Sequence, residues 1–90
     1  MGVLIPATTA EKFSEPFGVE PNVQKGLIAV GLAGSETAVV QVKASNGSWV
    51  DTSSVMTVAQ PDIRIEATTK EPIFRVRKNA TAGAAFVDSI

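Results

Sequence analysis

The side chains able to act as acids, bases or nucleophiles are spread along the sequence without a catalytic spacing. A glycosidase pair or a calcium loop needs two or more converging carboxylates, and no Asp-x-Asp spacing occurs. Serines have no histidine to activate them, because the chain contains none. We therefore predict that the protein is not an enzyme and that it has no catalytic residues, no metal site and no cofactor. The carboxylates considered are Glu36, Asp51, Asp62, Glu66, Glu71 and Asp88.

The densest basic cluster consists of Arg75, Arg77 and Lys78. A nucleic-acid surface needs more positive charge than this, together with aromatic residues on which bases stack. The net charge of −1 gives no long-range attraction to nucleic acid or to an anionic membrane. We predict that these cations occupy solvated strand positions, paired with Glu66 or Glu71 across a hairpin.

The length and composition indicate one small domain without disulfide bonds. The 90 residues include no cysteine, which excludes disulfides, and no histidine, which removes the commonest metal ligand. A chain of this size buries only about 60–65% of its unfolded surface, so its own core, partner chains or both must hold it. No apolar run reaches transmembrane length, and residues 3–5 are too short for a signal peptide. We expect a product that stays in the cytoplasm until it is assembled, with no membrane partner.

Residues 1–22 are predicted to form an extended N-terminal arm outside a domain at residues 23–90. Pro6, Pro16 and Pro21 remove amide donors and favour extended backbone before them. Phe13 and Phe17 are the expected anchors of this arm. Either they dock on the molecule's own sheet, or they reach a neighbouring subunit together with the rest of the arm. The candidate partner interface is therefore Val3, Leu4, Ile5, Pro6, Phe13 and Phe17.

Residues 36–51 contain the strongest local signal, an Asn46-Gly47 turn between two β-prone runs. Asn-Gly favours a tight hairpin because both central residues must take positive φ. A two-residue turn places Ala44 opposite Trp49, so that Trp49 shares a face with Val40 and Val42. A longer turn with Gly47 in a bulge places Val42 opposite Val50 and moves Trp49 to the other face. We prefer the first register, because a lone tryptophan contributes most when it is buried.

Further strands are predicted from apolar alternation at residues 24–32, 55–59, 63–67, 73–78 and 84–90. Both faces of residues 24–32 are largely apolar, which indicates a central strand or a strand at a subunit contact. In the last strand, Phe86 is the expected core residue. Strands that recur every 8 to 12 residues between turn residues are typical of an all-β sandwich or barrel. We predict a small antiparallel β-sandwich or barrel of six to seven strands.

Two stretches of the sequence carry a resemblance: Val40-Gln41-Val42-Lys43, a glycine turn and Trp49-Val50-Asp51, then Ile73-Phe74-Arg75-Val76-Arg77-Lys78 and Ala80-Thr81-Ala82-Gly83-Ala84. They resemble the hairpin and closing strands of small virion proteins of tailed bacteriophages. Such proteins are β-sandwich or barrel modules that decorate or cement capsids, or serve as head-fibre and tail accessory parts. The chain lacks the fibre or host-binding extension of longer members, which favours decoration. The resemblance covers roughly residues 36–90.

The resemblance implies a structural protein of the virion surface, made in the host cytoplasm. It would bind and stabilise the lattice of major capsid protein, with no small-molecule substrate. Copies of itself are a second expected partner, because exposed strand edges favour a trimer or another closed ring. The alternative is a sugar- or host-surface-binding module of the head-fibre or tail type. An outward-facing Trp49 would favour this alternative, since sugars stack on aromatic rings.

Overall fold

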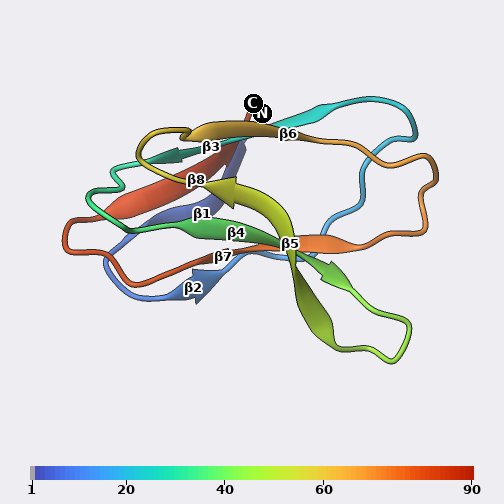
Figure 1. Ribbon diagram of the computed structural model, residues 1–90, viewed down its shortest axis with the longest axis horizontal. Helices are drawn as coiled ribbons and strands as arrows, with labels where there is room; N and C mark the ends of the chain where they lie inside the picture. The colour runs from blue at the N-terminus through green and yellow to red at the C-terminus, as the bar shows by residue number, and fades with distance from the viewer. Residues whose placement is uncertain (1) are drawn as a thin grey trace.

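The computed structural model describes residues 2–90, which form eight strands and no helix. The strands are β1 Gly2–Thr8, β2 Lys12–Phe13, β3 Lys25–Val30, β4 Ala38–Lys43, β5 Trp49–Met56, β6 Asp62–Ile65, β7 Phe74–Lys78 and β8 Ala85–Ser89. They pair antiparallel in two sheets, with the orders β1-β8-β3-β6 and β2-β7-β4-β5 (Figure 1). The predicted all-β fold of two antiparallel sheets is confirmed, with eight strands in place of six to seven.

Consecutive strands lie in opposite sheets, except β4 and β5, which form a hairpin within the second sheet. β1 contacts β2 at one edge of the sandwich, and β5 contacts β6 at the other. The two sheet orders then set β8 across from β7 and β3 across from β4. This is the strand order of a jelly roll, a sandwich of eight strands built from two Greek keys. As a consequence, the N-terminal segment contributes an edge strand to each sheet.

The free arm predicted for residues 1–22 is not what the structure shows. β1 pairs with β8, with Gly2 opposite Ser89, and β2 pairs with β7. Further along, Phe17 bridges Phe74 on β7. The prolines indicated an arm because they cannot sit in a central strand, yet an edge strand tolerates them at bulges, and Pro6 lies in a bulge of β1. Position 1 lies outside the described residues.

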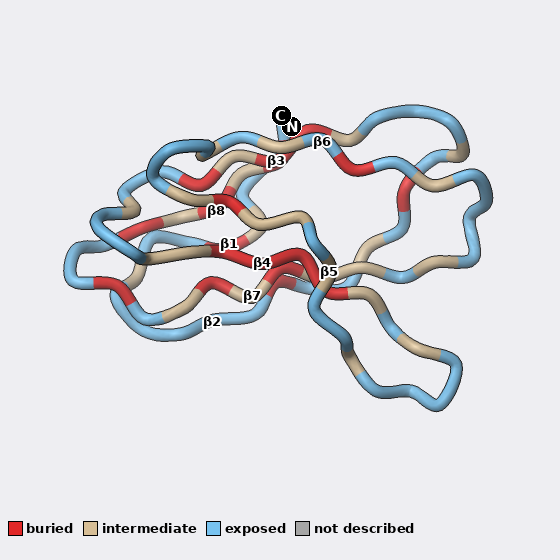
Figure 2. Tube along the Cα trace, in the orientation of Figure 1, coloured by how far each residue is buried: buried red, intermediate tan, exposed pale blue. Residues whose placement is uncertain are grey.

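The apolar core lies between the two sheets, where the buried segments of the central strands face each other (Figure 2). Phe86 was expected in this core but is half-buried, while its neighbours Ala85 and Val87 point inward. The pairing of β8 with β3 fixes this alternation, because it sets Val87 opposite the buried Ala29. The core cluster is Ile5, Val19, Leu27, Ala29, Ala38, Val40, Met56, Ile65, Val76 and Val87.

The four edge strands carry features that discourage pairing with another chain. β1 has two register shifts and a proline, and β2 and β6 span only two and four residues. β5 shifts register between Val39 and Gln41 of its partner strand, where the Thr52 hydroxyl donates to the Val40 carbonyl at 2.8 Å. Bulges, prolines and short edge strands protect sheets from edge-to-edge association. The edges are therefore poor sites for strand addition.

Lys78 belongs to the core side of β7, although the basic cluster was expected to be solvated. Its side chain is fully buried. The ammonium donates to the Asn79 carbonyl at 3.1 Å and to the Thr81 hydroxyl at 3.4 Å. Burial lowers the pKa of Lys78 below 10.5, and the nearby Glu36 carboxylate partly raises it again. The inward position follows from alternation, since Phe74 and Val76 share that face.

We expect Lys78→Met to stabilise the protein most at neutral pH, with a gain that shrinks at alkaline pH. Between the lowered pKa of Lys78 and 10.5 the unfolded chain binds more protons than the folded chain, so wild-type stability rises with pH there. Urea unfolding of both proteins at a series of pH values measures the difference between their free energies of unfolding. Lys43→Met, which removes an exposed ammonium, controls for net charge. A difference in the free energy of unfolding that stays constant with pH would contradict the lowered pKa of Lys78.

We expect Ile5→Ala to lower the free energy of unfolding by about 2–5 kcal/mol, because it leaves a cavity between the sheets. The side chain of Ile5 is 0% exposed, whereas that of Val3 in the same strand is 63% exposed. Val3→Ala is the matched control, with an expected loss of under about 0.5 kcal/mol. Chemical denaturation of the two variants compares them directly. Equal, small losses would mean that β1 is not part of the folded sandwich in solution.

Candidate functional site

The β4–β5 hairpin has a three-residue loop, 45–47, in place of the two-residue turn that the sequence favoured. The Gly47 amide donates to the Ala44 carbonyl at 2.9 Å, and the Ala44 amide donates to the Ser48 carbonyl at 2.7 Å. Gly47 has φ +90°, as a turn with a glycine bulge requires. Val42 therefore lies opposite Val50, and Lys43 lies opposite Trp49. The preferred register was wrong, and the bulged alternative is confirmed.

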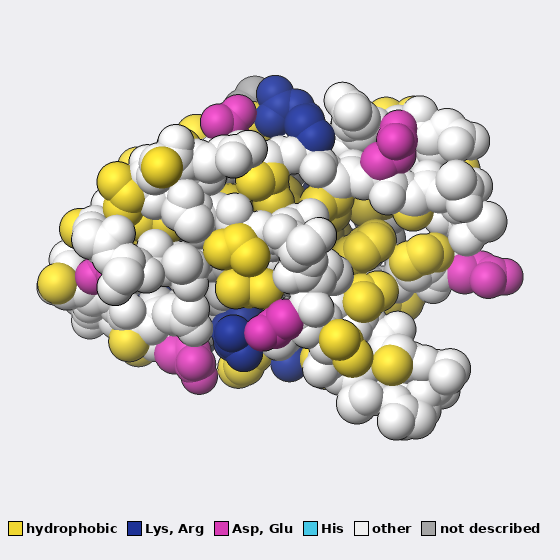
Figure 3. Space-filling view, in the orientation of Figure 1, with side chains coloured by type: hydrophobic (Ala, Val, Ile, Leu, Met, Phe, Trp, Pro, Cys, Tyr) yellow, Lys and Arg dark blue, Asp and Glu magenta, His cyan; other side chains and the backbone are white. Residues whose placement is uncertain are grey.

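This register places Trp49 on the outer face of the second sheet and not in the core. Its strand neighbour Val50 points to the other side of the hairpin and is 49% exposed. The distal part of the hairpin projects beyond the sandwich, at the lower right of Figure 1. Hydrophobic side chains lie at the base of this projection in the space-filling view (Figure 3). The hairpin thus offers an aliphatic side at Val42 and Val50 and an aromatic, basic side at Lys43 and Trp49.

Arg75 lies between two aromatic rings on the outer face. Its guanidinium carbon is 4.1 Å from the centre of the Phe13 ring and 4.4 Å from the centre of the Trp49 ring. Phe13 comes from β2, on one side of β7, and Trp49 comes from β5, on the other side. Contacts of this kind are attractive because the ring faces carry negative charge, and they are stronger where water is excluded. The two rings therefore hold the guanidinium in place.

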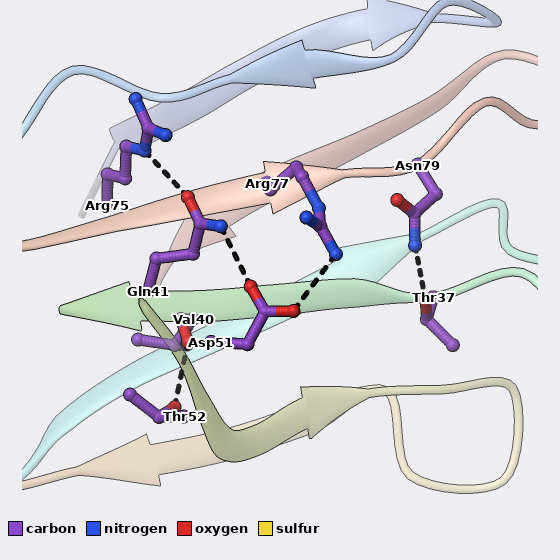
Figure 4. A network of polar contacts seen from close by, with 8 residues as sticks. All are labelled: Thr37, Val40, Gln41, Asp51, Thr52, Arg75, Arg77 and Asn79. Carbon is purple, nitrogen blue, oxygen red and sulfur yellow. Dashed lines mark hydrogen bonds and ion pairs between the residues drawn. The ribbon is translucent and has the colours of Figure 1, made fainter. Parts of the chain in front are cut away.

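A chain of hydrogen bonds continues from Arg75 across the sheet (Figure 4). Arg75 Nε donates to Gln41 Oε1 at 2.7 Å, and Gln41 Nε2 donates to Asp51 Oδ1 at 2.8 Å. Arg77 closes the chain, because its Nη2 donates to Asp51 Oδ2 at 3.3 Å. The partner of the basic cluster is thus Asp51, and the pairing with Glu66 or Glu71 predicted from the sequence was wrong. The buried Gln41 side chain links the two arginines through this carboxylate.

The predicted interface residues are divided between the core and the surface. Ile5 is buried, and Leu4 and Phe17 pack against the core from its margin. Val3, Pro6 and Phe13 are exposed. The Phe17 ring lies 6.2 Å from the Phe74 ring, so both phenylalanines of the expected arm contact this chain's own second sheet. Only Phe13 joins the outer-face cluster, which we define as Phe13, Gln41, Trp49, Asp51, Arg75 and Arg77.

A cavity of about 550 Å³ lies beside β3 and the end of β8. Its lysines are already engaged: Lys70 pairs with Glu20 at 3.7 Å, and Lys25 Nζ lies 3.4 Å from Ser89 Oγ and 5.5 Å from the Phe17 ring. Among residues 2–90, no three histidine, cysteine or carboxylate side chains gather closely enough to hold a metal ion. The lysines that line the cavity are therefore already paired, and the outer-face cluster is the better candidate.

We find no match to the chain among protein-family models, curated proteins or solved structures. Residues 2–90 contain no helix that is long and apolar enough to cross a membrane.

Proposed function

We propose that the chain is a structural protein without catalytic activity, a capsid decoration or cement subunit that binds and stabilises a lattice of major capsid protein. The jelly-roll order of its strands supports this at the level of fold, since viral capsid domains use it, although lectin domains use it too. The choice between these classes therefore depends on the surface that the molecule presents.

The projecting β4–β5 hairpin is the observation that carries the proposal. Its two sides present different chemistry, and Val50 stays about half exposed because no other strand covers the tip (Figure 2). Isolated exposed valines are common, but a hairpin that extends beyond its sandwich can insert between two neighbouring subunits. When such a contact is repeated at every symmetry-related position of a shell, many individually weak contacts together give strong binding.

The contact surface differs from the one expected from the sequence. Deletion of residues 1–12 would remove β1 and the buried Ile5, so truncation tests folding and not docking. Strand edges are also a weak basis for assembly here, given their bulges, their proline and their short lengths. The proposal therefore places the contact with capsid protein on the hairpin and the outer face of the second sheet. Assembly with further copies of the chain, in a trimer or another ring, remains part of the proposal.

We expect Val50→Asp to weaken binding to purified capsid shells by about tenfold or more, because it puts a charge into the contact. Co-sedimentation of the full chain with shells of the virus that encodes it measures occupancy. Val58→Asp is the matched control, since Val58 is also 49% exposed but lies outside the hairpin, in the loop after β5. Full occupancy by the Val50 variant, or equal losses in both variants, would refute a contact through the hairpin.

A sugar- or host-surface-binding module is the second candidate, and the outward position of Trp49 favours it. Sugar sites use exposed aromatic faces, and here two rings share one surface. Against this role, Arg75 covers a face of each ring at 4.1 and 4.4 Å, so a sugar would have to displace the guanidinium before stacking there. The arrangement therefore fits a site built around Arg75 better than a site built around the bare rings.

A further inference from the structure

We propose that the outer face of the second sheet binds an acidic segment of a partner protein, with Arg75 as the residue that receives a carboxylate side chain. This inference deepens the proposed function, since it names the chemistry that the partner presents to the same surface.

Arg75 is fixed in position while part of its hydrogen-bonding capacity remains unused. The Phe13 and Trp49 rings confine the guanidinium plane, and Nε is held by Gln41 at 2.7 Å. Among residues 2–90, the terminal nitrogens of Arg75 make no hydrogen bond. Terminal guanidinium nitrogens form two parallel bonds to a carboxylate, and a side chain already held in place loses little freedom when they form. Arg75 is thus prepared for a planar anion.

The strands of the second sheet concentrate the positive charge of a chain whose net charge is −1. They contain a single carboxylate, Asp51, which Gln41 and Arg77 already engage. In the first sheet, by contrast, the charges of Lys25 and Arg64 are balanced by Asp62 and Asp88. An acidic partner is therefore electrostatically matched to the second sheet and not to the first. The cations on its outer face are Lys43, Arg75 and Arg77, whereas the buried Lys78 and Lys12, which lies opposite it, belong to the other face.

A peptide carboxylate fits this surface better than a nucleic-acid backbone does. The residues on either side of β2 include Glu11 and Glu15, which would repel an extended polyphosphate. A polypeptide can place one or two carboxylates at Arg75 and present neutral or basic groups to those loops. Tryptophan and arginine together are also the residues that dominate protein–protein contacts. The occupant is therefore assigned to protein and not to nucleic acid.

Titration of the full chain with the diglutamate peptide Gly-Ser-Glu-Glu-Ser-Gly tests the proposal, with Gly-Ser-Gln-Gln-Ser-Gly as the neutral control. Binding is followed by the fluorescence anisotropy of the labelled peptide at low ionic strength, and the emission of Trp49, the single tryptophan, gives a second readout. We expect saturable binding of the diglutamate peptide alone. Arg75→Gln should weaken it by about tenfold or more, since charge-assisted hydrogen bonds are lost. Arg75→Lys should also weaken it, because lysine lacks the planar fork.

Arg64→Gln is the control for net charge, because Arg64 is an exposed arginine on β6 whose ion pair with Asp62 is 3.5 Å long. It should change the affinity by less than about twofold. Equal losses in the Arg64 and Arg75 variants, no saturable binding, or a response to maltohexaose in place of the diglutamate peptide would overturn the proposal. The titration uses no capsid, so its failure is separate from a failure of shell binding. Unfolding curves of each variant establish that the sandwich is intact.

Discussion

The architecture depends on the burial of Ile5 between the sheets, which ties the N-terminal segment into both of them. β1 closes one edge of the first sheet, and the chain then crosses to the second sheet as β2. This crossing brings Phe13 next to β7, where its ring meets Arg75. Without it, one of the two rings that confine the guanidinium would be missing. The segment expected to bind a partner directly thus completes the surface on which we place binding.

Much of the fold could be predicted from the sequence, because period-two alternation shows where strands occur. The strand at residues 73–78 and the hairpin with its glycine turn were recovered in this way. The N-terminal strand was missed, because prolines and short apolar runs are as compatible with a bulged edge strand as with a free arm. What places this segment in the sheet is its pairing with β8, which lies at the other end of the sequence. The same is true of β8, where pairing with β3 sets Phe86 outward.

The candidate site was less predictable than the fold. Its residues come from four strands, and Phe13, Trp49 and Arg75 have no spacing that would link them. The side on which Trp49 lies depends on one residue of loop length, and sequence propensity favoured the shorter turn. A tryptophan can be covered without entering the core, and here the Arg75 guanidinium lies over the Trp49 ring. The basic cluster is visible in the sequence, but its acidic partner is Asp51 on β5, which β4 separates from β7.

We therefore propose that the chain, a sandwich with protected edges, binds through one face and one projecting hairpin. Hydrogen exchange of the chain, free and bound to capsid shells, tests this claim most directly. We predict slower exchange at the amides of residues 42–50 on binding, with β1 and the rest of the first sheet unchanged. Protection confined to residues 2–8, with the hairpin as open as in the free protein, would contradict the account and return the contact to the N-terminal segment.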